Sequence, residues 1–530
     1  MLTFSLQNFV SFLLLGLMVA VILRVTRRTR SSTLPLPPGP KRLPIIGNLL
    51  DMPKKNIATS MHELCRQYGG CEIVYLDVFG QPTIIIDSYD AAIAILESRS
   101  ANTSDRPRFV MAELTGFIFE FALVGYSASW RQRRRVFHDF FHRRAVAQFR
   151  PIHRRGVQRL LKKLLDEPAK FLDHSRYYVG GSIMDTVYGI EIAEKNDRFI
   201  AIAEEGAEIF NDTLAPGRHL VELFPVLARL PAWFPGAGFK RHLEEKWKPV
   251  VLALRGAAYD ATVEALGRGD ARPSITCSLV ENAIREKGSV SAEDEDIFKD
   301  VTGVAYAAGA DTAGVFSISC RGTMLILQHQ TFSILTAFFR AMAAYPEVQR
   351  KARTEIEEVV GPDQLPDFSH QEVLPYVSAL VKECIRWHTV LPLGIPHRAM
   401  EDDEYNGYLI PAGAVIITNA WAMSRDPLVY PEPDRFMPDR FLKDGKLDLH
   451  ARDPLKFQFG FGRRICPGMH FSQDSLFIAI ASILHAFEIS PPLGAAGHAM
   501  HATSPTIPTG GVLSHPDPFT CSIVPRSQIA

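Results

Sequence analysis

This chain of 530 residues lacks a net charge, because 58 Lys and Arg residues balance 58 Asp and Glu residues. Nothing in that balance points to a nucleic-acid partner. Cysteine is scarce as well: seven are scattered along the sequence, without a C-x-x-C spacing. We therefore expect neither a disulfide framework nor a structural zinc site, and mostly reduced thiols facing the cytosol. Internal repeats, low-complexity tracts and a G-x-G-x-x-G nucleotide-binding motif are also missing from the sequence.

Charge is missing in particular from residues 1–23, which form an apolar run, and Arg24, Arg27, Arg28 and Arg30 follow it. A run of about 20 apolar residues can span a bilayer, and flanking arginines favour its cytoplasmic side. A cleaved signal peptide would carry its basic residues before the apolar run. We expect residues 1–30 to be an uncleaved transmembrane anchor with a basic stop.

Prolines crowd the next segment, Leu34-Pro-Leu-Pro-Pro-Gly-Pro40. Proline cannot continue a helix, so this composition predicts a stiff hinge over residues 31–45. Residues 46–530 would then form one large body.

The pattern of the body predicts mainly α structure with small β-sheets. β-Branched runs around Gly80 predict a hairpin over 73–86, and shorter runs predict strands at 408–410 and 415–418. The tail, 510–524, is expected to form another strand pair. Helical periodicity marks the ranges 91–266, with proline breaks, 296–312, 331–360 and 469–487.

The most informative motif is the sequence Phe459-Gly-Phe-Gly-Arg-Arg-Ile-Cys-Pro-Gly468. Its glycines allow a tight backbone, and two arginines and a following helix N-terminus would lower the cost of a buried thiolate at Cys466. A thiolate is the form in which cysteine ligates iron. The alternative is a buried free cysteine in a glycine-rich turn.

This F-x-x-G-x-R-x-C-x-G pattern resembles the haem-binding loop of the cytochromes P450. The resemblance extends over nearly the whole chain and implies the P450 fold, with haem b (heme b) as cofactor. It implies Cys466 as the axial ligand to the metal, and Phe459, Arg464 and Gly468 as further haem-binding residues of the loop.

A second signature is Lys382-Glu-Cys-Ile-Arg386, about 80 residues before the cysteine. Glu383 and Arg386 share one face of a helix, and taken alone they would be a surface pair. With Pro438-Asp-Arg-Phe441 between the two motifs, the P450 resemblance implies a buried structural triad of Glu383, Arg386 and Arg440. Asp439 stands where the family usually has glutamate.

Haem propionates need cationic or N–H donors. Trp130-Arg-Gln-Arg-Arg134 resembles the W-x-x-x-R helix of the family, which implies Trp130 and Arg134 as propionate contacts, together with His397 and Arg464. We expect Arg134 to point inward. Arg131 and Arg133 are expected to point outward, as a solvated basic face or a docking surface for an acidic partner.

The sequence Ala308-Gly-Ala-Asp-Thr312 resembles the oxygen-activating part of the central P450 helix. Gly309 would permit close approach to haem, and Asp311 and Thr312 would be the catalytic residues that manage protons. Without the cysteine loop, an alanine-rich helix end would explain this segment equally well.

The chain departs from the family directly after Thr312. Joining Thr312 to Thr331 restores a continuous helical pattern, so residues 313–330 are an atypical insertion of 18 residues. They are either a retained intron or a genuine insertion. As a helix they would displace the downstream part of the chain by about 27 Å, and an inactive haem-binding protein is one possible result.

The resemblance implies a monooxygenase that inserts one atom of O2 into a lipophilic small molecule, held by apolar stretches at 106–126 and 390–395. Since the chain has no flavin motif, an NADPH-cytochrome P450 reductase is the expected partner. The segment 230–237 resembles fungal P450s of secondary metabolism, and terpenoid, polyketide and indole substrates all remain open. The expected location is the endoplasmic reticulum membrane, single-pass, with the catalytic domain facing the cytosol. A P450-fold isomerase or dehydratase is the other alternative.

Overall fold

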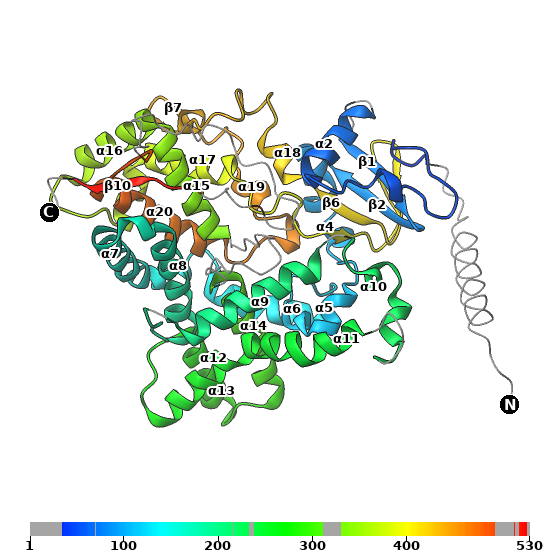
Figure 1. Ribbon diagram of the computed structural model, residues 1–530, viewed down its shortest axis with the longest axis horizontal. Coiled ribbons are helices and arrows are strands. Elements are labelled where there is room, and N and C mark those ends of the chain that lie inside the picture. Colours follow the sequence, from blue (N-terminus) through cyan, green and yellow to red (C-terminus); the bar gives the residue numbers. More distant parts are fainter. Residues whose placement is uncertain are drawn as a thin grey trace. The chain divides into compact units, whose positions relative to one another are not determined.

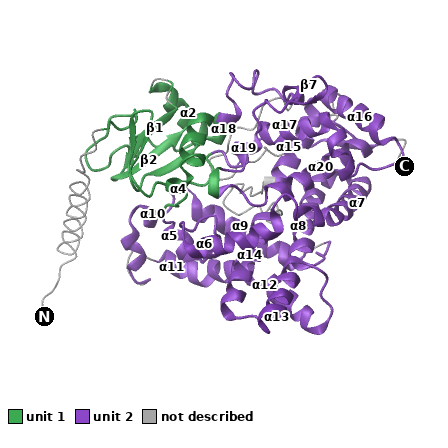
Figure 2. Ribbon diagram, turned by 180° about the vertical axis from the view of Figure 1, so that it is seen from behind, with its two compact units in different colours: residues 1–107, 393–422, 461–463 green, residues 108–392, 423–460, 464–530 purple. Residues whose placement is uncertain are grey.

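The computed structural model describes residues 34–68, 70, 72–194, 196–215, 217–232, 238–310, 330–492, 514 and 519–526. The chain forms two compact units, which Figure 2 shows in green and purple. In described residues, unit 1 takes those of 34–107, 393–422 and 461–463, and unit 2 takes those of 108–392, 423–460 and 464–526. The predicted membrane anchor, residues 1–30, lies outside the described residues. Among the helices that are described, none is both long and apolar enough to cross a membrane.

Unit 1 is built on a small sheet. In both units, short 3-10 and π helices are labelled η. The elements of unit 1 are η1 Leu49–Asp51, α2 Ile57–Gln67, β1 Ile73–Val78, β2 Gln81–Ile86, α3 Tyr89–Ala92, η2 Ile93–Glu97, α4 Ser100–Thr103, β3 His397–Arg398, β4 Asp403–Tyr405, β5 Tyr408–Ile410 and β6 Val415–Thr418. The four-stranded sheet has the order β1-β2-β6-β3, and β4 pairs separately with β5.

The predicted hairpin is confirmed: β1 and β2 are antiparallel, with Ile73 opposite Ile86. The strands predicted at 408–410 and 415–418 are β5 and β6. β6 joins β2 in parallel, so a late segment completes a sheet begun early in the chain. Val74, Leu76 and Ile85 pack against Met61 and Cys65 of α2, because one face of the sheet must be covered by an apolar helix face.

The described part of the predicted hinge is bonded to unit 1. Pro35 and Pro38 accept hydrogen bonds from the N–H groups of Leu409 and Tyr75, at 2.8 and 2.9 Å. A Cβ at Gly39 would lie 2.1 Å from the Tyr75 carbonyl oxygen, so only glycine allows this approach. From Pro35 onward the proline-rich segment therefore belongs to the folded body.

Unit 2 is almost entirely helical (Figure 1). The elements of its first half are α5 Val110–Thr115, η3 Phe117–Phe119, α6 Ala128–Phe141, η4 Val146–Phe149, α7 Arg150–Asp166, η5 Pro168–Lys170, α8 Phe171–Tyr188, α9 Arg198–Leu214, α10 Leu220–Leu223, η6 Pro225–Arg229, α11 Phe239–His242, η7 Leu243–Trp247, α12 Lys248–Arg268, α13 Ile275–Lys287 and α14 Ala292–Ala310. Those of its second half are α15 Gln330–Ala344, α16 Pro346–Val360, η8 Phe368–Val373, α17 Pro375–Trp387, η9 Pro438–Phe441, β7 Leu442–Lys443, β8 Lys446–Leu447, α19 Leu455–Gln458, α20 Met469–Ala486, β9 Phe487–Ser490 and β10 Ser522–Pro525. Two short elements, α18 Ala420–Ser424 and η10 Gly462–Arg464, contain residues of both units.

The helical range predicted at 331–360 is confirmed, and it consists of two helices, α15 and α16. Pro346 separates them: it occupies the first position of α16, where its missing N–H costs nothing, and it cannot continue the hydrogen bonds of α15. Of the strand pair predicted over 510–524, residues 510–513 and 515–518 lie outside the described residues. Within the described residues the tail has one strand, β10, and its partner is β9, which follows α20 directly.

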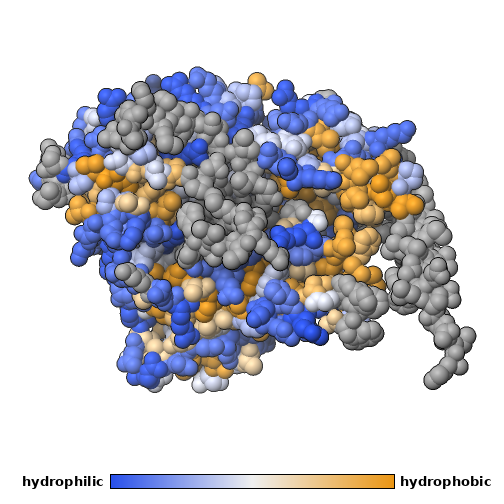
Figure 3. Space-filling model, in the orientation of Figure 1, coloured by the Kyte–Doolittle hydropathy of each residue, from blue (hydrophilic) through white to orange (hydrophobic). Residues whose placement is uncertain are grey.

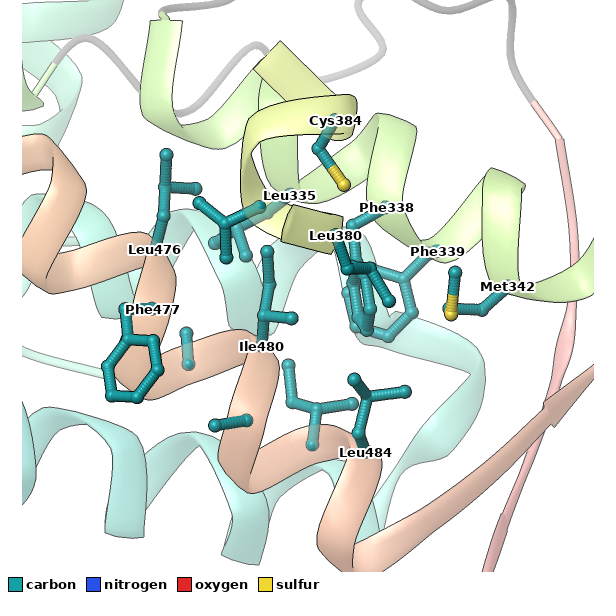
Figure 4. Packing of buried hydrophobic residues seen from close by; sticks show 14 of the residues in the cluster. Leu335, Phe338, Phe339, Met342, Leu380, Cys384, Leu476, Phe477, Ile480 and Leu484 are labelled. Atoms are coloured by element: carbon teal, nitrogen blue, oxygen red, sulfur yellow. The ribbon is translucent and has the colours of Figure 1, made fainter. Parts of the chain in front are cut away.

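The core of unit 2 lies among α15, α17 and α20, whose side chains converge in Figure 4. Every residue of α20 from Ser475 to Ala486 is buried, which is typical of a helix that is apolar all round and packed on all sides. Leu335 and Phe338 of α15 and Leu380 of α17 have no exposed surface. This core holds the helix that begins just after Cys466.

Truncating one core leucine tests the packing. Leu335→Ala is expected to lower the free energy of unfolding by about 2–5 kcal/mol, because a buried leucine leaves a cavity behind. The same change at Leu428, which is 94% exposed, should cost under about 0.5 kcal/mol. Denaturant unfolding of both variants measures the difference, and equal costs would contradict the assigned core.

Candidate active site

Cys466 lies in the loop that joins α19 to α20. Its N–H donates to the Phe459 carbonyl at 2.7 Å and closes the loop. Gly460 has a φ of +82°, a left-handed conformation that glycine adopts without strain. Gly468, the residue before α20, has a φ of −84°. This φ is open to any residue, so Gly468 contributes to the site through its N–H, which forms a hydrogen bond with the Cys466 sulfur.

Three groups of unit 2 favour negative charge on the Cys466 sulfur. Burial is the largest effect and leaves the pKa of the Cys466 thiol above its ordinary value, while hydrogen bonding from the Gly468 and Met469 N–H groups and the charge of Arg134 offset part of that rise. The arginine of this set is Arg134, from α6, which the sequence had linked to a haem propionate. The sulfur thus faces a helix N-terminus and a half-buried guanidinium, which offset part of the cost of a thiolate at this position.

The residues predicted to bind propionate meet near the backbone of Phe121. The Trp130 indole N–H donates to the Phe121 carbonyl at 3.0 Å, and Arg464 donates to the same oxygen at 3.2 Å. The Arg464 guanidinium also stacks over the Trp130 ring, 4.2 Å from its centroid. Arg134 donates to the Ile465 carbonyl. The structure therefore brings Trp130, Arg134 and Arg464 together beside Cys466.

The prediction for Arg131 and Arg133 was half wrong. Arg131 is exposed and lies over the Tyr126 ring. Arg133 instead donates to Asp300 of α14 at 2.6 Å and to Asp296 at 3.0 Å, and its side chain is mostly buried. Helical spacing predicts which face of α6 a residue lies on. It does not predict that α14 supplies two carboxylates, Asp296 and Asp300, to the face that carries Arg133.

Glu383, Arg386 and Arg440 form one buried network in unit 2. Arg386 donates to Glu383 at 2.7 and 2.8 Å, and Arg440 donates to Glu383 at 3.2 Å. The Glu383 and Arg386 side chains have no exposed surface. Glu383 also accepts the Met437 N–H at 2.8 Å, and Arg386 donates to the Ser424 and Pro433 carbonyls. The network ties α17 to the segment that leads into η9.

His397 and Arg398 lie in unit 1. His397 is buried in β3, with Nδ1 2.8 Å from the Thr103 carbonyl oxygen, while Arg398 is half exposed and pairs with Asp105 at 3.7 Å. Gly462, also in unit 1, has a φ of +54°, and a Cβ there would lie 2.4 Å from the Leu96 carbonyl oxygen. The glycine at 462 is thus required by both conformation and space.

The central helix is α14, described to Ala310, so the predicted catalytic residues Asp311 and Thr312 lie outside the described residues, as do residues 313–329 of the insertion. Gly309 is tightly packed: a Cβ there would lie 2.6 Å from Ile183 of α8. The described structure therefore explains this glycine by the packing of α14 against α8.

Sequence reasoning missed one titratable residue of this region, Glu120. It stands in the apolar run Phe117-Ile-Phe-Glu-Phe-Ala-Leu-Val124, and a lone acid in such a run was the available signal. Burial raises its pKa to about 7. Its charge raises the pKa of the Cys466 thiol in turn.

The residues present fit a haem held by one thiolate. The donor set is a single sulfur with two backbone N–H groups. Beside it lie an indole N–H, the buried Arg464 and the half-buried Arg134, and these donors suit carboxylates. Cys466, Trp130, Arg134 and Arg464 would hold the group. Such a fold and site define a haem-thiolate protein.

Comparison with known proteins agrees. The sequence model of the cytochrome P450 family matches residues 37–312 and 328–521. The chain is 38% identical, over 94% of its length and 93% of the relative, to cytochrome P450 monooxygenase COX1 of Coprinopsis cinerea. It is 35% identical, over 93% and 91%, to cytochrome P450 monooxygenase 176 of Postia placenta, and 35% identical, over 98% and 97%, to tryptamine 4-monooxygenase of Psilocybe cyanescens. The chain belongs to the cytochrome P450 family and is a monooxygenase of that family.

Charge removal from the triad gives a stability prediction. Arg386→Met leaves Glu383 buried with Arg440 as its only remaining cation among the described residues, so we expect a loss of about 3–5 kcal/mol in unfolding free energy. Lys351→Met is the matched control, because Lys351 and its partner Asp439 are 54% and 50% exposed. That change should cost less than about 1 kcal/mol. Thermal or denaturant unfolding measures both, and a tolerated Arg386→Met would refute a structural role for the triad.

Proposed function

We propose that this protein is a membrane-anchored monooxygenase that inserts one oxygen atom of O2 into a lipophilic small molecule, with haem b as cofactor. The observation that carries the proposal is the setting of Cys466, a buried sulfur beside two N–H groups and Arg134. When bound, a thiolate-ligated haem supplies the activation of O2.

The chain's own residues have distinct tasks in this proposal. Cys466 ligates the iron, and the N–H groups of Gly468 and Met469 stabilise its charge. Trp130, Arg134 and Arg464 bind the propionates, with Phe459, Gly468 and His397 as further cofactor contacts. Asp311 and Thr312 hold and deliver protons on the distal side. Glu383, Arg386 and Arg440 fix the segment that precedes the loop.

Electrons, location and substrate complete the proposal. P450 monooxygenases generally draw electrons from a redox partner, and the partner proposed here is an NADPH-cytochrome P450 reductase. The anchor at residues 1–30 would hold both proteins at the endoplasmic reticulum membrane, with the catalytic domain in the cytosol. The proposed substrate is a fungal secondary metabolite, and the relative named for tryptamine supports indoles among the candidates.

A second candidate is a haem-binding protein without turnover. The family match stops at residue 312 and resumes at 328, so the unmatched stretch lies within the proposed insertion 313–330. An interruption directly after Thr312 would separate the proton-managing residues from the rest of their helix. Sequencing the mature transcript tells whether the codons for 313–330 are a retained intron.

The reduced carbon-monoxide spectrum tests the proposed ligand. The full chain is expected to show the red-shifted band of a thiolate-ligated haem, and Cys466→Ala should abolish it. Cys277→Ala, a change at a buried free cysteine outside the loop, should leave the band unchanged. An unaltered spectrum after Cys466→Ala would refute the assignment.

Deletion of residues 313–330 separates the two candidate functions. With reductase, NADPH and a panel of lipophilic compounds, we expect product from the deletion variant in excess of that from the full chain. A variant in which residues 313–330 are replaced by 18 Gly and Ser residues shows whether the length or the sequence of the insertion matters. Equal, NADPH-dependent product formation by the full chain and the deletion variant would exclude the inactive alternative.

A further inference from the structure

Glu120 is a buried acid among aromatic side chains. It follows η3 directly, its exposed fraction is 7%, and Phe117, Phe119 and Phe121 around it are buried. η3 packs on α14, where a Cβ at Gly303 would lie 3.4 Å from the Phe119 ring. The acid is therefore held beside the central helix by rigid apolar contacts.

The carboxyl has little compensation for its burial. Its hydrogen bond is a local one, in which the Ala122 N–H donates to Oε1 at 3.3 Å. Within the described residues no arginine, lysine or histidine forms an ion pair with it. The nearby arginines of α6 and α12, Arg133 and Arg255, are committed to Asp300 at 2.6 Å each. A buried carboxylate without a cation is costly, so this position has a reason other than stability.

Glu120 lies close to both the cysteine loop and the central helix. It precedes Phe121, whose carbonyl oxygen accepts hydrogen bonds from Trp130 and from Arg464 of the cysteine loop. The pKa of Glu120 is raised chiefly by burial and further by Asp300 of α14, and Glu120 itself raises the pKa of the Cys466 thiol. The carboxyl is therefore within electrostatic range of the central helix and of the cysteine loop. Both of these neighbours are acidic groups, so neither supplies the positive charge that would balance the carboxylate.

We propose that Glu120 is a specificity-determining residue that binds the cationic group of a lipophilic amine and so selects basic substrates for the monooxygenase site. This inference rests on the proposed function, because it places the substrate at the haem that Cys466 would hold. The aromatic residues next to Glu120 bury the apolar part of the substrate, and the carboxylate supplies a negative charge within this apolar stretch. An ion pair that is shielded from water is strong. A neutral substrate would leave the Glu120 carboxylate buried without a partner, which lowers the affinity for that substrate.

The probe must carry a cation that cannot ligate iron. Phenethyltrimethylammonium meets this condition, because its nitrogen has no lone pair. Its neutral carbon isostere, (3,3-dimethylbutyl)benzene, has the same shape. Since the neutral compound is the more hydrophobic of the two, an apolar site without a carboxylate prefers it. Preference for the cation thus reports a buried negative charge.

The experiment measures Kd of both probes by titration calorimetry on the full, haem-loaded chain. We expect the wild type to bind the cation at least about tenfold more tightly than the isostere. Glu120→Gln should reverse that preference without weakening the isostere, and Glu120→Asp should retain part of it. Glu204→Gln is the control, because Glu204 is another acid with a pKa raised by burial to about 7, yet it has Arg176 nearby.

The reduced carbon-monoxide spectrum of the same samples separates the two failures. Suppose that the thiolate-type band is present. If the protein then shows no preference for the cation, or if the preference survives Glu120→Gln, the assignment of Glu120 is overturned and the proposed function stands. A cation preference that depends on Glu120 in a protein without that band contradicts the proposed function instead. The band together with a Glu120-dependent preference supports both.

Discussion

Negative charge on a buried sulfur is the physical constraint on which this structure depends. A thiolate out of water is unstable unless fixed dipoles and cations surround it. Here the dipoles come from Gly468 and Met469 at the start of α20, and the cation comes from Arg134 of α6. These groups belong to separate helices. The site therefore exists only when α6 and α20 keep their positions relative to the loop that carries Cys466.

The rest of unit 2 holds these helices in place. The core among α15, α17 and α20, whose packing Figure 4 shows, fixes the helix that begins just after Cys466. The Glu383 network fixes α17 to the chain that leads toward the cysteine loop. The surface is mixed by contrast, and Figure 3 shows orange, hydrophobic patches among blue, hydrophilic ones. The exposed apolar residues of unit 2 include Leu220 and Val226.

Local patterns predicted local structure well. The strands at 408–410 and 415–418, the hairpin and α20 follow from β-branched runs and apolar periodicity. The family motifs identified Cys466, Trp130, Arg134, Arg464 and the Glu383 triad as residues that would meet. Contacts that depend on distant segments were not predictable in this way. Neither the pairing of β10 with β9 nor that of Arg133 with Asp300 leaves a trace in the local sequence. Glu120 was passed over because only the fold shows that its carboxyl has no cation among the described residues.

The most direct measurement of the central claim is iron K-edge X-ray absorption on the purified, haem-loaded chain. The account predicts one sulfur scatterer in the coordination shell of the iron, and its loss in Cys466→Ala. A shell made only of nitrogen and oxygen in the unaltered protein, or a sulfur that persists without Cys466, would contradict it.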